Sequence, residues 1–98
     1  MSSVKMEFVK THKDAKLPER AHASDSGYDL TSVEETTIPA KGSAVVPVGL
    51  TLGYLEPGWW FRIEPRSGLG FKKSLQPHLG IIDNGYRDDL GVKLYNFS

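Results

Sequence analysis

Three short segments of this 98-residue chain combine glycine with a carboxylate or a cation, the residue types that bind small charged ligands. The first segment covers residues 21–30 and includes Asp29. The second, residues 65–70, reads Pro-Arg-Ser-Gly-Leu-Gly, and the third, residues 80–87, reads Gly-Ile-Ile-Asp-Asn-Gly-Tyr-Arg. Each segment taken alone is also compatible with an ordinary surface turn.

Asp83 lies where the apolar stretch 79–82 meets an Asn-Gly pair. A carboxylate held at a strand end is able to accept a proton from water, whereas a turn aspartate often only hydrogen-bonds the backbone. Tyr86, three residues later, is placed either to stack on a ligand ring or to cover the turn. Spacing alone leaves both alternatives open for both residues.

Arg66, Ser67 and Gly68 offer a planar cation, a hydroxyl group and approachable backbone amides, a set suited to phosphate oxygens. A surface turn that carries an arginine is the alternative, and spacing alone favours it. Asp29 follows Ser-Gly-Tyr at the head of an expected strand. It is suited either to face a hydrated Mg²⁺ ion, which often meets only one or two carboxylates, or to cap a turn.

Short strands are expected to position these segments. Ten glycines and six prolines divide the chain, and no window sustains helical periodicity. We predict strands at residues 4–8, 36–38, 44–55, 59–63, 79–82 and 90–97. Turns are expected at residues 39–42 and 56–58. Short strands with turns between them predict an all-β sandwich or barrel.

Three local features refine this prediction. Pro47 and Gly49 interrupt a β-rich stretch, which indicates a bulge or an edge position. Asn84 and Gly85 predict a hairpin between the last two strands. The Trp-Trp-Phe run at residues 59–61 is expected to lie mostly in the core, with one face available for a subunit contact.

Composition restricts the function further. Lys and Arg together number 12, as do Asp and Glu, so no net charge favours binding to a nucleic-acid backbone. The absence of cysteine excludes disulfides and thiolate metal sites and suggests a reducing compartment. No signal peptide or membrane span is recognisable, so a cytoplasmic protein without a membrane or nucleic-acid partner is expected.

Together the three segments resemble, in order and spacing, the first three of five motifs of the trimeric deoxyuridine triphosphatase (dUTPase) family. The resemblance extends from about Leu17 to Asn96. The combination of Pro-Arg-Ser-Gly-Leu with Gly-Ile-Ile-Asp-x-x-Tyr-Arg is highly specific. It implies a distorted jelly-roll-like β-barrel and a homotrimer. It also implies Mg²⁺-assisted hydrolysis of dUTP to dUMP and pyrophosphate, which limits uracil incorporation into DNA.

The resemblance implies roles for residues of the third segment. Asp83 matches the aspartate that orients and activates the attacking water. Tyr86 matches the aromatic residue that packs on the sugar and leaves no room for a 2′-hydroxyl group. The backbone of Gly80, Ile81 and Ile82 matches the segment that hydrogen-bonds uracil.

It implies roles for the other two segments as well. Arg66, Ser67 and Gly68 match the residues of the second motif that hold phosphate oxygens. Asp29 matches the aspartate of the first motif that meets Mg²⁺ through water. Binding of the nucleotide is thus expected to draw on all three segments.

The fourth and fifth family motifs do not occur before Ser98. We therefore expect one dUTPase-like domain, residues 1–98, that lacks the C-terminal part of the family pattern and hydrolyses dUTP slowly on its own. Two other functions stay open. One is that of the related dCTP deaminase, for which no deaminase glutamate signature is visible, and the other is a nucleotide-dependent binding module for a regulatory partner.

Overall fold

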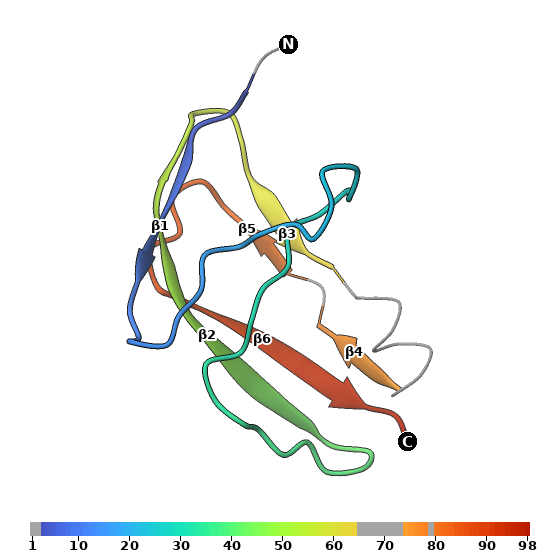
Figure 1. Cartoon of the computed structure of the whole chain (residues 1–98). Coiled ribbons are helices and arrows are strands. Elements are labelled where there is room, and N and C mark those ends of the chain that lie inside the picture. Colours follow the sequence, from blue (N-terminus) through green and yellow to red (C-terminus); the bar gives the residue numbers. More distant parts are fainter. Residues whose placement is uncertain (1–2, 65–73, 79) are drawn as a thin grey trace.

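The computed structural model describes residues 3–64, 74–78 and 80–98, whose arrangement Figure 1 shows. Within these ranges all regular structure is β-strand, which confirms the all-β prediction. The six strands are β1 (Met6–Lys10), β2 (Ser43–Leu55), β3 (Phe61–Ile63), β4 (Leu75–Pro77), β5 (Gly80–Ile82) and β6 (Asp89–Asn96). No helix in this part of the chain has the length and apolar character that a membrane crossing requires.

The strands form two antiparallel sheets (Figure 1). The larger sheet has the order β1-β2-β6-β4, and β3 pairs with β5 in the smaller one. With 13 residues, β2 is the longest of the described strands and pairs with β1 along one edge and β6 along the other. An irregularity in β2 therefore affects both of its neighbours.

The ladder between β2 and β6 is interrupted where the sequence predicts a bulge. Pro47 pairs with Gly91 and Thr51 with Asp89, so the ladder advances by four residues on β2 but by two on β6. Gly49 lies in this interruption with φ of +68°, a left-handed conformation that favours glycine. The predicted bulge is confirmed, in a central strand rather than at an edge.

Two carbonyl groups of β2 at the bulge accept hydrogen bonds from the connection between β1 and β2. The Gly49 carbonyl accepts a hydrogen bond from the Thr11 N–H at 2.8 Å, and the Pro47 carbonyl accepts one from the Val33 N–H at 3.1 Å. Each such bond contributes about 1 kcal/mol net. Two points of the long connection between β1 and β2, Thr11 and Val33, are thereby attached to the larger sheet.

Apolar side chains of β2 form the centre of the core. Leu50 and Leu52 are fully buried, and each contributes roughly 2 kcal/mol through burial. Val48 and Leu50 cluster with Ala15 and with Leu90 of β6. The partly buried residues packed on this cluster are Phe8, Leu30, Val33, Phe61, Ile82, Tyr86 and Val92.

The two predicted turns and the predicted first strand are all confirmed, but the first strand buries less of one face than expected. The Gly42 N–H donates to the Pro39 carbonyl at 2.9 Å, and the Trp59 N–H donates to the Glu56 carbonyl at 3.2 Å. In β1 only Phe8 is half-buried, since Met6 is exposed.

The strand predicted at residues 36–38 is wrong. These residues pair with no strand in the described part of the chain, and the Ile38 carbonyl instead accepts a hydrogen bond from the Asn96 side chain at 2.8 Å. Conversely, β4 escapes sequence prediction because its Pro77 argues against a strand. Strand β4 is an edge strand of the larger sheet, next to β6, and proline is tolerated in edge strands.

The expectation that the tryptophan run lies mostly in the core is also wrong. Trp59 and Trp60 are 50% and 53% exposed. Strand β3 begins only at Phe61, whose ring meets Phe8 edge-on with centroids 6.0 Å apart. The two tryptophans lie between the turn and β3. Because they precede the strand, they are not part of its alternation of inward-facing and outward-facing side chains.

The predicted Asn-Gly hairpin is wrong, although a turn forms there. The Tyr86 N–H donates to the Asp83 carbonyl at 3.0 Å. However, β5 pairs with β3, while β6 pairs with β2 and β4, so residues 83–88 cross from one sheet to the other. A two-residue type I′ hairpin needs positive φ at both central residues, and neither Asn84 nor Gly85 has it. We call residues 83–88 the crossing turn.

We predict that Gly49→Ala lowers the free energy of unfolding by about 2–5 kcal/mol, because it combines a left-handed backbone with overpacking. A Cβ atom at this position would lie 2.7 Å from His12 Cβ and 2.9 Å from Val33 Cγ1. Gly27→Ala is the control, since nothing lies within 4 Å of its Cβ position. Urea unfolding measures both, and equal stability of the two variants would contradict the packing described here.

Candidate functional site

Residues 19–29 form a loop closed at its base by a backbone bridge. The Asp29 N–H donates to the Glu19 carbonyl at 2.8 Å, and the two residues form an isolated antiparallel bridge. Inside the loop, the Asp25 N–H donates to the His22 carbonyl at 3.0 Å, and the His22 N–H donates to the Asp25 carboxylate at the same distance. The loop is therefore an ordered unit, and the sequence-predicted Asp29 lies at its closing point.

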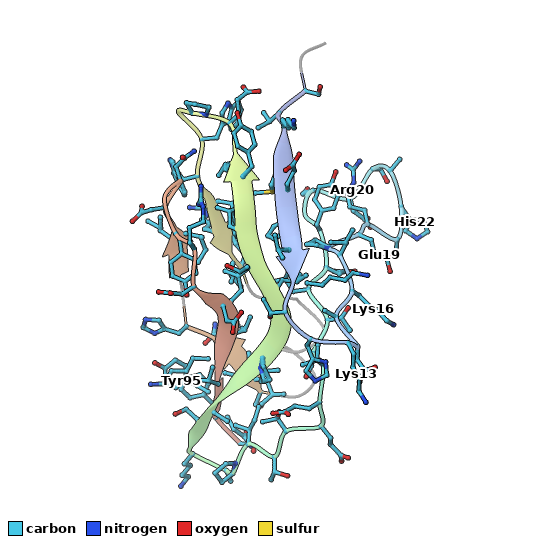
Figure 2. All side chains as sticks on the ribbon, turned by 90° about the vertical axis from the view of Figure 1, so that its left-hand side faces the viewer. Lys13, Lys16, Glu19, Arg20, His22 and Tyr95 are labelled. Atoms are coloured by element: carbon cyan, nitrogen blue, oxygen red, sulfur yellow. The ribbon has the colours of Figure 1, made fainter. Side chains whose placement is uncertain are left out.

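Arg20 holds this loop from within. Its guanidinium group donates to the carbonyl oxygens of Ala23 at 3.2 Å and Asp25 at 3.4 Å. The same group lies over the Tyr28 ring, 4.8 Å from its centroid, a distance at which a cation is attracted to the ring face. Figure 2 shows Arg20 and His22 on a loop that projects to one side of β1.

A hollow of about 540 Å³ lies at the base of this loop. Its lining brings together one cationic and two carboxylate side chains with backbone and hydroxyl groups. The residues that line it are Glu19, Arg20, Ala21, Asp29, Leu30, Thr31 and Ser32. The sequence predicts Asp29 here but not Glu19 or Arg20, which no motif spacing marks.

Strand β5 supplies a second candidate surface. In the described part of the chain it pairs only with β3, so its other edge presents backbone N–H and C=O groups for a ligand. Ile81 is 65% exposed, while Ile82 packs against the core. A Cβ atom at Gly80 would meet only the His78 carbonyl, at 4.0 Å, so a flat ligand has room close to the backbone.

The crossing turn carries Asp83 and Tyr86 in different settings. Asp83 is exposed, and its carboxylate has no hydrogen-bond or ion-pair partner among the residues that the structure describes. The Tyr86 ring packs against the core cluster, and its hydroxyl group donates to the Asp89 carbonyl at 2.9 Å. The carboxylate is therefore available to solvent, whereas the tyrosine ring is fixed at both ends.

One side chain holds the crossing turn from outside and another from within it, and the sequence predicts neither role. The Thr51 hydroxyl group, on the β2 bulge, lies 2.6 Å from the Arg87 carbonyl and 2.9 Å from the Asp88 carbonyl. The Arg87 guanidinium group donates to the carbonyls of Asn84 and Tyr86, both at 2.8 Å. The Thr51 contacts join positions far apart in the sequence, so no sequence signal marks them, whereas the Arg87 contacts are local to the turn.

The remaining predicted residues, Arg66, Ser67 and Gly68, lie outside the described residues. Asp83 is not among the residues that line the hollow beside Asp29. Within the described ranges, no group of three or more histidine or carboxylate side chains is arranged to hold a metal ion. The structure thus shows two separate candidate surfaces, one on the loop of residues 19–32 and one on β5 and the crossing turn.

Comparison with known proteins identifies relatives over nearly the whole chain. The family model described as dUTPase matches residues 13–98. The chain is 45% identical over 89 residues to a deoxyuridine 5′-triphosphate nucleotidohydrolase from Solanum lycopersicum, covering 91% of this chain and 52% of that protein. It is 42% identical over 96 residues to the protein of that name from Yarrowia lipolytica, covering 98% and 59%. The chain therefore spans about half the length of the curated relatives that it matches.

Solved structures with the same fold come from phage dUTPases. A variant of the Staphylococcus bacteriophage 80alpha dUTPase with dUpNHpp superposes with a TM-score of 0.88 at 30% identity, covering 96% of this chain and 55% of that one. A variant of the dUTPase from phage phi11 of S. aureus, described with a structural Mg(II) ion, gives 0.87 at 29% identity, covering 96% and 61%. The fold thus defines a jelly-roll-like β protein of the kind these phage proteins represent, as predicted.

Taken with the family match over residues 13–98, this likeness decides the family. The chain belongs to the dUTPase family.

We predict that Arg20→Ala accelerates hydrogen exchange of the Asp25 and Asp29 amides about 3- to 10-fold, because it removes a cation–π contact and two weak hydrogen bonds. Lys16→Ala removes an exposed positive charge near the same loop and is expected to leave exchange unchanged. Exchange followed by NMR at residue resolution distinguishes the variants. Equal protection in both would show that Arg20 does not hold the loop.

Proposed function

We propose that this protein hydrolyses dUTP to dUMP and pyrophosphate and so limits uracil incorporation into DNA. The observation that carries the proposal is the juxtaposition of an open edge on β5 with the solvent-facing carboxylate of Asp83, in a chain that belongs to the dUTPase family. The edge provides backbone groups for a base, and the carboxylate provides an acceptor for a proton from water.

Uracil binding is assigned to the backbone of Gly80, Ile81 and Ile82. Their ladder to β3 fixes the strand, so the donors and acceptors of its other edge are held in place before the base arrives. Cytosine exchanges the uracil O4 acceptor and N3–H donor for the opposite pattern. Binding cytosine would leave backbone groups unpaired, at about 1–3 kcal/mol each. The exposed Ile81 leaves this edge accessible.

Hydrolysis is assigned to Asp83. Its carboxylate accepts a proton from the attacking water, whose oxygen bonds to the α-phosphorus while the bond from that phosphorus to the bridging oxygen of pyrophosphate breaks. The exposure of Asp83 supports this assignment, since a water molecule is able to reach it. The chain's contribution is mainly positioning, because no covalent intermediate is required.

Sugar selection is assigned to Tyr86. The ring is fixed between the core cluster and the Asp89 carbonyl, so it is not free to swing aside for a larger ligand. A rigid ring beside C2′ of the sugar would clash with a 2′-hydroxyl group. Selection for deoxyribose would then come from steric exclusion rather than from a hydrogen bond.

Phosphate binding is assigned to Arg66, Ser67 and Gly68, and Mg²⁺ binding through water to Asp29. The hollow around Asp29 and Glu19 suits an ion that keeps most of its waters and phosphate ligands, and not one enclosed by protein ligands. Bound Mg²⁺ would neutralise negative charge on the triphosphate. Asp29 would orient the water shell of that ion.

We further propose that the two candidate surfaces meet between subunits of a homotrimer. The support is that the hollow beside Asp29 does not include Asp83, although the family resemblance assigns both residues to one reaction. In this arrangement residues 1–98 act as one dUTPase-like domain whose sheets close into a distorted barrel. A cytoplasmic location is proposed as well, while one relative, from Dictyostelium discoideum, is named as mitochondrial.

The two alternative functions receive less support. The relatives cited above are named for hydrolysis of deoxyuridine triphosphate, not for deamination of a cytosine nucleotide. One structural neighbour, the phage 80alpha dUTPase, is described as controlling transfer of virulence genes. No surface in the described residues of this chain points to such a partner. Incubation of the complete natural protein with dUTP or dCTP, followed by product separation, tests all three functions: dUMP supports hydrolysis, and a deaminated product or no product contradicts it.

We predict that Asp83→Asn lowers kcat for dUTP by at least about 100-fold, because an amide does not accept the proton of the attacking water. The shape of the crossing turn and nucleotide affinity should persist, since the Asp83 carbonyl, not its carboxylate, closes the turn. Pyrophosphate release and calorimetric binding of a non-hydrolysable analogue measure the two effects. Near-normal turnover by the variant would remove Asp83 from the mechanism.

We predict that Tyr86→Ala reduces the preference for dUTP over UTP at least about 10-fold, because removal of the ring opens space beside C2′. Tyr86→Phe is the matched control. It keeps the ring and loses only the hydroxyl group that donates to the Asp89 carbonyl. The ratio of kcat/KM for the two nucleotides should change in the alanine variant and much less in the phenylalanine variant, and an unchanged ratio in both would place selection elsewhere.

A further inference from the structure

We propose that Asn84 is a positioning residue for the hydrolysis, because its side chain anchors the crossing turn that carries Asp83. The inference rests on the proposed function. Asn84 does not touch the substrate in this proposal and acts only through its neighbour. Its role is to keep the exposed carboxylate of Asp83 in one direction.

The side chain of Asn84 connects two turns that are remote in sequence. Its Nδ2 atom lies 3.0 Å from each of three backbone carbonyl oxygens, those of Leu55, Glu56 and Trp59. An amide nitrogen carries two donor hydrogens, which are here shared among three acceptors. We call these three carbonyls the carbonyl socket. A socket made only of acceptors requires a donor and disfavours a carboxylate or an apolar group.

The carbonyl socket is held in place independently of Asn84. Leu55 is buried at the end of β2, and the Glu56 N–H donates to the Lys5 carbonyl at 3.0 Å. The Trp59 N–H donates to the Glu56 carbonyl, and Gly58 has φ of +90°, which fixes a tight turn. The socket is consequently a firm attachment point for the amide.

The position of Asp83 depends on this attachment. Its carboxylate has no partner in the described ranges, so the backbone of the crossing turn sets its direction. The Asn84 carbonyl is itself bound by the Arg87 guanidinium group at 2.8 Å. Asn84 is thus fixed through both its side chain and its backbone, and release of the side chain would let the adjoining Asp83 shift.

The same geometry predicts which kinetic constant changes. Strand β5 is held by its ladder to β3, and Tyr86 is held by the core and the Asp89 carbonyl. Neither contact involves the Asn84 side chain. Loss of that side chain should therefore disturb the carboxylate and leave the base and sugar surfaces in place.

The test replaces Asn84 in the complete natural protein. Asn84→Ala removes the donor and the side-chain volume, whereas Asn84→Leu removes the donor at similar volume. We expect both variants to lower kcat for dUTP about 10- to 100-fold with KM within about twofold of the parent, as a displaced catalytic group would. Exchange of the Tyr86 amide, whose hydrogen bond closes the turn, should also become faster.

Asn96→Ala is the matched control. Asn96 is also half-buried and also donates a side-chain amide hydrogen to a backbone carbonyl, that of Ile38, but it lies at the far end of β6. The Asn96→Ala variant should lose thermal stability, while its kcat and the hydrogen exchange of its Tyr86 amide should stay unchanged. Parental kcat in both Asn84 variants, or an equal kcat loss in Asn96→Ala, would overturn the inference while the proposed function stands. If the unsubstituted protein does not hydrolyse dUTP, the proposed function itself is contradicted, and the positioning role of Asn84 is contradicted with it.

Discussion

The bulge in β2 is the constraint on which the rest of the structure depends. Between Pro47 and Thr51 the strand leaves its ladder with β6, and Gly49 adopts a backbone conformation that few other residues tolerate. The Gly49 and Pro47 carbonyls bind Thr11 and Val33, so the segment between these two residues, which contains the loop of residues 19–29, is fixed to the sheet on both sides. The Thr51 hydroxyl group holds the far end of the crossing turn. One local irregularity therefore places both candidate surfaces.

The two candidate surfaces lie on different segments of the chain. The loop that carries Asp29 is closed on itself through Glu19 and Arg20, while Asp83 lies on the crossing turn between the two sheets. The hollow beside Asp29 does not include Asp83. The proposed mechanism needs both carboxylates, and in the proposed trimer they come from different copies of the chain.

The sequence predicts the parts of this structure that depend on neighbouring residues. The all-β fold follows from short strands and turns, and the bulge follows from Pro47 and Gly49. The Asn-Gly hairpin fails because β5 pairs with β3 and the Asn84 side chain binds the carbonyl socket, contacts with distant residues that the local pattern does not contain. For the same reason the motif predicts Asp83 but not the residue that anchors it. Roles taken from the family resemblance stay predictions.

Subunit mixing tests the central claim most directly. Asp29→Asn and Asp83→Asn variants of the complete protein, each expected to be nearly inactive, are unfolded together in equal amounts and refolded. If each site takes Asp29 from one subunit and Asp83 from another, random assembly gives about one quarter of the sites both carboxylates, and about one quarter of the parental dUTP hydrolysis should return. Activity no greater than that of the separately refolded variants would contradict the account, because both residues would then act within one subunit.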